Sequence, residues 1–204
     1  MSRRGAAGAA VLAGLGLLAA LAACPRPASS PAGRDPARAA ALAAFVRVAA
    51  VLRHPRCINC HTTTEFPRQG DQGQPHVLGV RRGPDDRGEV GMRCSACHQA
   101  ANQLNGVPGA PSWALAPLSM GWEGLDDHAL AEALKDRARN GGRSLGELVR
   151  HMSEDPLVDW GWRPGGERAP VPVDKATFLA DLRAWIAAGA PSSDLGSSRT
   201  GSRP

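Results

Sequence analysis

Cys57-Ile58-Asn59-Cys60-His61 and Cys94-Ser95-Ala96-Cys97-His98 are the two stretches around which this 204-residue chain is organised. Each is a complete Cys-x-x-Cys-His motif, the pattern of covalent c-type haem attachment. Two thiols three positions apart lie on one turn and add to the two vinyl groups of a haem. The histidine that follows then lies beneath the iron as its axial ligand. The motifs predict two covalently bound haems, with His61 and His98 as iron ligands.

Zinc binding and disulfide formation are the alternatives for these four cysteines. In zinc ribbons the two pairs are usually about 15–20 residues apart, whereas 33 residues separate Cys60 from Cys94. Zinc binding also gives no reason for a histidine directly after both pairs. Disulfides within the pairs would close very short loops and stabilise the fold little. Haem attachment is therefore the favoured interpretation.

The N-terminal segment 1–23 predicts an export signal of the lipoprotein type. Two arginines precede a short apolar stretch of Ala, Leu and Gly, which is too short for a permanent membrane helix. The segment ends in Leu21-Ala22-Ala23-Cys24, which resembles a bacterial lipobox, so Cys24 is expected to carry acyl chains. An ordinary cleaved signal peptide is the alternative. Residues 24–35, rich in Pro and Ala, predict a tether.

Export and lipidation indicate a membrane-anchored protein of the bacterial periplasm, on either the inner or the outer membrane. Haem c is also matured on the outer side of the inner membrane, which agrees with export. The formal net charge of +5 includes two arginines of the signal segment. About four haem propionates would offset the remaining positive excess. No nucleic-acid partner is therefore expected.

The pattern of apolar residues predicts one mainly α-helical domain over residues 36–190, with cytochrome c-like helices, long irregular haem-binding loops and no substantial sheet. The C-terminal helix is expected to pack across the N-terminal one, as in small cytochrome c domains. The predicted helices begin at the capping residues Asp35, Asp126 or Asp127, Ser144 and Asp174. Residues 62–91, 106–117 and 160–162 are expected to be irregular, and residues 191–204 to be a disordered tail.

The aromatic content is low, with three Phe, five Trp and no Tyr in the whole chain. Two buried porphyrins would supply the apolar bulk that the side chains do not. We therefore expect that the core does not form without haem.

Apart from Met1 and the two motif histidines, seven Met and His residues are available as sixth iron ligands. Met120, in a Pro-flanked loop downstream of the second motif, is the first candidate, and His76, between the motifs, is the candidate for the first iron. His151 and Met152 are reserves. Because neighbouring helical residues point about 100° apart, at most one of these two is expected to face a given iron.

Smaller motifs extend over nearly the whole mature domain: His54-Pro55-Arg56-Cys57, Gly106-Val107-Pro108-Gly109-Ala110-Pro111, Leu115-Ala116-Pro117, Met120, Arg139-Asn140-Gly141-Gly142-Arg143, His151-Met152, Asp155-Pro156-Leu157-Val158, Trp160-Gly161-Trp162 and Ala184-Trp185-Ile186. With them the chain resembles exported bacterial cytochromes labelled as an isoquinoline 1-oxidoreductase subunit. The resemblance implies a redox partner of a molybdenum hydroxylase. The chain is too short for a molybdopterin domain, and every cysteine is already assigned. It is therefore not expected to be the catalyst.

Electron transfer is the leading functional interpretation. Electrons would come from a periplasmic dehydrogenase and leave to an oxidase or another cytochrome, with the lipid anchor holding the protein at the membrane. A dihaem peroxidase or a haem-based sensor, each with an open coordination site, is the alternative. Peroxidases with two such motifs are longer and space them further apart. No residue of this chain is predicted to be catalytic.

Overall fold

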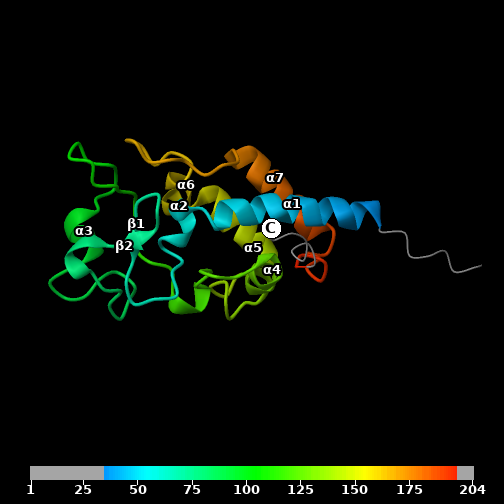
Figure 1. Cartoon of the computed structure of the whole chain (residues 1–204), viewed down its shortest axis with the longest axis horizontal. Coiled ribbons are helices and arrows are strands. Elements are labelled where there is room, and N and C mark those ends of the chain that lie inside the picture. The colour runs from blue at the N-terminus through cyan, green and yellow to red at the C-terminus, as the bar shows by residue number, and fades with distance from the viewer. Residues whose placement is uncertain (1–34, 197–204) are drawn as a thin grey trace, which may run out of the picture. The chain divides into compact units, whose positions relative to one another are not determined.

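The computed structural model describes residues 35–196, and Figure 1 shows their helices and strands. The expected signal segment 1–23, Cys24 with its expected lipid, and residues 197–204 lie outside the described residues. The described residues belong to a single compact unit. None of the helices within it has both the length and the apolar character needed to cross a membrane.

The described chain is mainly helical, as the sequence predicts. Its α-helices are α1 (Pro36–Leu52), α2 (Pro55–Ile58), α3 (Cys94–Cys97), α4 (Asp127–Lys135), α5 (Leu145–Glu154), α6 (Pro156–Trp160) and α7 (Lys175–Ala187). Two 3-10 helices, Val77–Gly79 and Leu118–Met120, lie in the loops. The strands β1 (Arg68–Gln69) and β2 (Gln74–Pro75) pair antiparallel, with Arg68 opposite Pro75.

Helix α1 begins where the sequence predicts. The side chain of Asp35 accepts a hydrogen bond from the backbone N–H of Ala37 (3.0 Å), and Pro36 occupies the first helical position, where its missing N–H costs nothing. Phe45, Val48 and Leu52 are buried. The helix therefore packs an apolar face into the core and leads the chain directly to the first motif.

Helix α7 packs against α1, which confirms the predicted pairing of the terminal helices. The rings of Phe45 in α1 and Trp185 in α7 lie 4.6 Å apart. Arg47 of α1 donates two hydrogen bonds, of 2.7 and 2.5 Å, to the carboxylate of Asp181 in α7. Apolar packing and a bidentate ion pair thus fix the crossing of the two helices.

Helices α4 and α5 begin at their predicted caps. Asp126 caps α4, and Ser144 and Glu147 form the capping box predicted for α5. Helix α4 ends at Lys135. It does so because Asp136 takes an extended conformation and its side chain accepts a hydrogen bond from the following turn.

One helix was missed, and the predicted tail begins too early. Trp160, expected in a turn-rich stretch, ends α6, whose first N–H groups are capped by the side chain of Asp155. Residues 191–195, expected in the disordered tail, pack on the domain. The Ser192 carbonyl accepts a hydrogen bond from Nδ1 of His128 (3.0 Å), and Leu195 is buried. The chain thus buries part of a segment that its polar composition marked as exposed.

The segment between the first motif and α4 is largely irregular, as predicted, and contains α3 with the second motif. It forms the end of the domain opposite the N-terminal end of α1 (Figure 1). Arg82 is buried in this segment and donates hydrogen bonds to the backbone carbonyls of Thr62 (3.4 Å), Thr64 (3.3 Å) and Ala116. This guanidinium satisfies loop carbonyls that no helix or sheet would satisfy.

Candidate functional site

The first motif follows α1 through the short helix α2. His54 caps α2 by accepting a hydrogen bond from the N–H of Arg56 (3.3 Å). A cavity of about 450 Å³ opens beside the motif. Its lining includes both thiols and the histidine of the motif, together with apolar side chains of α1, α4 and α5: Cys57, Cys60, His61, Leu52, Leu134, Leu148 and Met152.

The imidazole of His61 is held in a single orientation. It stacks on the indole of Trp122, with ring centroids 3.5 Å apart and planes 9° apart. Its Nδ1 donates a hydrogen bond to the carbonyl of Met120 (2.9 Å). Burial lowers the pKa of His61 to about 4, so the ring is neutral near pH 7. Among the described residues Nε2 has no hydrogen-bond partner, so it is available as a metal ligand.

The second motif is built in a similar way. Cys94 begins α3 and Cys97 ends it, so both thiols lie on one helical turn as the motif predicts, and His98 follows directly. Nδ1 of His98 donates a hydrogen bond to the carbonyl of Pro108 (2.7 Å), and the ring stacks on Trp113 at 4.6 Å with planes 4° apart. A second cavity of about 660 Å³ is lined by Cys94, Cys97, His98, Pro108 and Trp113, among other residues.

This shared arrangement was not predicted from the sequence. In both motifs a backbone carbonyl accepts from Nδ1 and a tryptophan covers one face of the imidazole. The carbonyls stand 59 and 10 residues away from their histidines, so no common spacing marks them. A hydrogen bond of this kind fixes the tautomer and ring orientation of a metal-binding histidine.

His76 and Met120 lie beside the opposite motifs from those expected. His76, expected at the first iron, lines the second cavity, and its ring centroid lies 6.0 Å from that of His98. Two imidazoles that flank one metal ion have a similar separation, because each metal–nitrogen bond is about 2 Å long. Met120, downstream of the second motif, lines the first cavity. Its carbonyl accepts from Nδ1 of His61, on the side of the ring away from Nε2.

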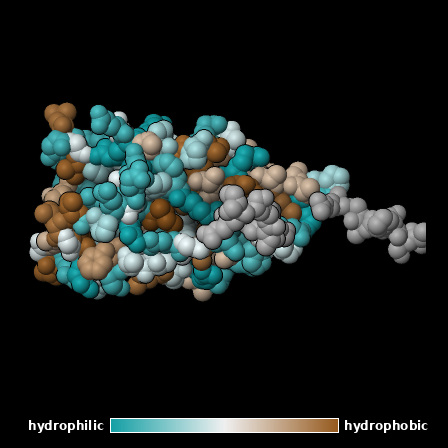
Figure 2. All heavy atoms as spheres, viewed as in Figure 1, coloured by the Kyte–Doolittle hydropathy of each residue, from teal (hydrophilic) through white to brown (hydrophobic). Residues whose placement is uncertain are grey.

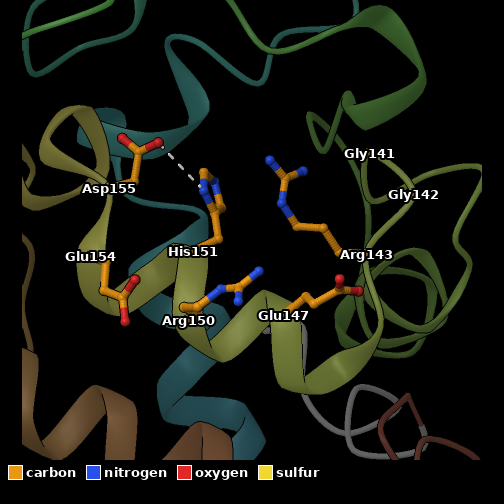
Figure 3. A pocket seen from close by; sticks show the side chains of 8 residues that line it. All are labelled: Gly141, Gly142, Arg143, Glu147, Arg150, His151, Glu154 and Asp155. Carbon is orange, nitrogen blue, oxygen red and sulfur yellow. Dashed lines mark ion pairs between the residues drawn. The ribbon is translucent and has the colours of Figure 1, made fainter.

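His151 and Met152 both line the first cavity. The angle of about 100° between neighbouring helical residues led us to expect at most one of them to face a given iron. Nδ1 of His151 lies 3.5 Å from the carboxylate of Asp155. Figure 3 shows Arg143 and His151 reaching from separate parts of the chain towards one opening. Arg143, His151 and Asp155 line both this opening and the first cavity, so the two adjoin. The first cavity therefore has a polar mouth.

The four cysteines of the two motifs are free thiols. Burial raises the pKa of Cys57 to about 12 and that of Cys60 to about 11, which keeps both protonated. A zinc site needs thiolates that converge on one point. In residues 35–196 no three His, Cys, Asp or Glu side chains cluster in this way.

The two cavities adjoin. Six residues line both of them: Arg56, Cys60, Trp113, Ala114, Leu115 and Trp160. Within this wall the Trp113 and Trp160 rings meet edge to face at 5.0 Å, and the Arg56 guanidinium lies 5.7 Å from the Trp160 ring centroid. The structure thus places the cavities of two motifs that are distant in sequence on either side of a shared wall, which contains Trp113 and Trp160.

Asn102 ties this wall to the loop of the second motif. Its Oδ1 accepts hydrogen bonds from Nε1 of Trp160 (2.9 Å) and from the N–H of Gly109 (2.9 Å), and its Nδ2 donates to the carbonyl of Pro164 (2.9 Å). Asn102 was not predicted as a site residue, because nothing in its local sequence signals contacts about 60 residues away.

The residues around both cavities fit a covalently attached haem. Volumes of about 450 and 660 Å³ fall within the range of about 300–1,000 Å³ found for cofactor sites. Several buried polar atoms of the lining have no protein partner, namely Arg56 Nε, Asn59 Oδ1, Arg68 Nε and Trp122 Nε1. Unpaired buried polar atoms are costly. The carboxylates of a haem would accept from the three N–H donors, whereas Asn59 Oδ1 is itself an acceptor and would need another donor.

Comparison of the chain with protein-family models, with curated proteins and with solved structures finds no match.

Proposed function

We propose that this protein is an exported c-type cytochrome with two haems and that it transfers electrons rather than catalysing a reaction of its own. One observation carries the proposal: each of two adjoining cavities contains a complete Cys-x-x-Cys-His motif whose histidine leaves Nε2 free. A haem bound there supplies a one-electron iron couple.

The proposed task of the chain's own residues is to hold and shield the two centres. The four motif thiols would form thioether bonds, and His61 and His98 would bind the irons. Trp122 and Trp113 keep the two imidazoles in place by stacking. Such fixed geometry favours electron transfer, because little has to move when the charge of a centre changes.

A redox role at the membrane follows from the remaining features. The proposed donor is a periplasmic dehydrogenase, of the molybdenum hydroxylase type that the family resemblance implies, and the proposed acceptor is an oxidase or another cytochrome. Acyl chains on Cys24 would hold the protein at the membrane surface. Each buried methylene adds about 0.8 kcal/mol to such an anchor.

The test is an absorption spectrum of the protein purified from a host that exports and matures c-type cytochromes. We expect two haems per chain, both resistant to extraction, and reduced low-spin bands that carbon monoxide leaves unchanged. Replacing Cys57 and Cys60 by Ser, or Cys94 and Cys97 by Ser, should each remove one haem. A chain that contains zinc or no cofactor after export would refute the proposal.

An open-site function, as a peroxidase or gas sensor, is the second candidate. The observation that favours it is the polar mouth of the first cavity, where Arg143 and His151 reach one opening (Figure 3). Polar groups on the distal side and steric access decide between ligand binding and electron transfer. A carbon monoxide shift at one of the two haems would favour this candidate over pure electron transfer.

A further inference from the structure

Arg56 occupies an unusual position for a charged side chain. Only 3% of it is exposed, and it lines both the first and the second cavity. The residue directly precedes Cys57, so the first motif itself places it in the wall. A buried charge is costly unless it is paired and fully hydrogen-bonded.

The partners of Arg56 within the protein satisfy it only in part. Its Nη2 donates to the carboxylate of Asp71, a side chain that is 40% exposed, while its buried Nε has no partner among residues 35–196. Arg168 also lines the second cavity, and burial together with the charge of Arg56 lowers the pKa of Arg168. Arg168 donates its hydrogen bonds to the backbone carbonyls of Gly106, Pro164 and Gly165. Among the described residues Asp71 is therefore the one carboxylate paired with either guanidinium, and this part of the wall keeps a positive charge.

Arg93 provides a comparison within the chain, because it stands at the same place before the second motif. Its side chain is 37% exposed, and Asp85 accepts hydrogen bonds from both terminal nitrogens (2.8 and 2.5 Å). The carbonyl of Gly88 accepts a third (2.8 Å). Arg93 is therefore satisfied by the protein, whereas Arg56 is buried between the cavities with unused donor capacity.

We propose that Arg56 is an anion-binding residue in the wall between the two cavities, that it donates to a carboxylate of the haem in the second cavity, and that its charge sets the reduction potential of both centres. The inference rests on the proposed function. A planar guanidinium suits carboxylates because it donates parallel hydrogen bonds. A positive charge held in a dry wall favours the reduced, less positive state of a nearby iron.

Potentiometric titration of the two haems in Arg56→Gln, Arg56→Lys and Asp71→Asn tests the proposal, with haem content measured for each variant. In Arg56→Gln both potentials should fall, each by the equivalent of about a tenfold change in the ratio of reduced to oxidised iron, which is about 59 mV. Arg56→Lys keeps the charge and should retain most of both potentials. Asp71→Asn removes the one carboxylate that pairs with Arg56 in the part of the chain that the structure describes, and it should raise both potentials.

Arg53→Gln is the matched control. Arg53 carries the same charge three residues earlier, is paired with Asp127 and lines neither cavity, so its loss should shift both potentials less. The proposal is overturned if Arg56→Gln keeps two haems and shifts the potentials no more than this control, or shifts only one of them. If Arg56→Gln does not fold, unchanged potentials in Asp71→Asn overturn it. Absence of haem from the parent protein would instead refute the proposed function.

Discussion

His76 is the residue whose role the structure changes most. It lies in the second cavity, 6.0 Å from His98 between ring centroids, and Nδ1 is hydrogen-bonded to the carbonyl of Val77 (2.7 Å), which leaves Nε2 free. If His76 is the sixth ligand of the second iron, His76→Ala should open one coordination site per chain. We expect reduced His76→Ala to bind carbon monoxide at one of its two haems.

His54→Ala is the matched control for this prediction. His54 caps α2 and lines neither cavity, so its loss should leave the spectrum unchanged. Identical carbon monoxide difference spectra for the parent and His76→Ala would exclude His76 as a ligand. The same comparison on His151→Ala and Met152→Ala would identify the ligand of the first iron.

Asn140 shows how a single buried side chain shapes the mouth of the first cavity. It is 1% exposed, donates to the carbonyls of Leu134 and Arg143 (both 2.8 Å), and accepts from the N–H of Arg143 (2.8 Å). These bonds hold a turn in which Gly141 and Gly142 both have positive φ, a conformation that other residues rarely adopt.

Asn140→Ala should lower the free energy of unfolding by about 1–3 kcal/mol, because it leaves buried backbone groups without partners. Chemical denaturation monitored by circular dichroism measures the change. Asn105→Ala is the control, since Asn105 is exposed and bonds only to its own loop; it should change stability by less than about 0.5 kcal/mol. Equal effects from both substitutions would contradict the structural role of Asn140.

At the scale of elements, a polar contact joins α6 to α7. Lys175 at the start of α7 donates to the carboxylate of Asp159 in α6 (2.6 Å), and this hydrogen bond lowers the pKa of Asp159. A carboxyl group whose pKa is lower in the folded state stabilises the fold above its ordinary pKa. That stabilisation is lost as the pH falls through the folded value.

Asp159→Asn should therefore destabilise the protein at pH 7 and have progressively less effect below about pH 4, near the ordinary pKa of Asp. Thermal unfolding of parent and variant at a series of pH values measures this. Glu154→Gln is the control, because Glu154 is exposed at the end of α5. A destabilisation that stays constant down to pH 2 would show that the charge of Asp159 contributes nothing.

At the scale of the whole molecule, the domain contains two adjoining cavities of about 450 and 660 Å³ beside its packed core. Figure 2 shows apolar surface at the end of the domain that carries the second motif. Leu78, Val90 and Leu104, in the loops that precede and follow that motif in the chain, are strongly exposed. The prediction that the core does not form without haem stays a prediction: the cavities leave room for a cofactor, while Phe45, Trp185 and other side chains already pack into a buried core.

The chain produced without export, and so without haem attachment, should be substantially less stable than the holoprotein, because a group bound only by the folded state stabilises that state. We expect a lower melting temperature and reduced helical circular dichroism. The variant with all four motif cysteines replaced by Ser, exported in the same host, is the control for differences in processing. Equal melting curves would show that the fold is independent of the cofactor.

Features that depend on a few neighbouring residues were predictable from the sequence. The caps Asp35, Asp126, Ser144 and Asp174 were correct because a capping side chain bonds to backbone groups two or three residues away. The missed helix α6 also has a local cap, Asp155 with Pro156, but its single turn is too short to show an apolar periodicity.

Alone, the sequence determined the two Cys-x-x-Cys-His motifs and the mainly helical class, since both follow from residue types at short, regular spacings. The pairing of the terminal helices was expected only from the resemblance to small cytochrome c domains. Only the tertiary structure decided that His76 lies beside the second motif and Met120 beside the first. It alone placed a tryptophan on each imidazole and Arg56 between the cavities. The physical reason is that irregular loops connect these residues, and their paths depend on long-range packing and hydrogen bonds that no local pattern encodes.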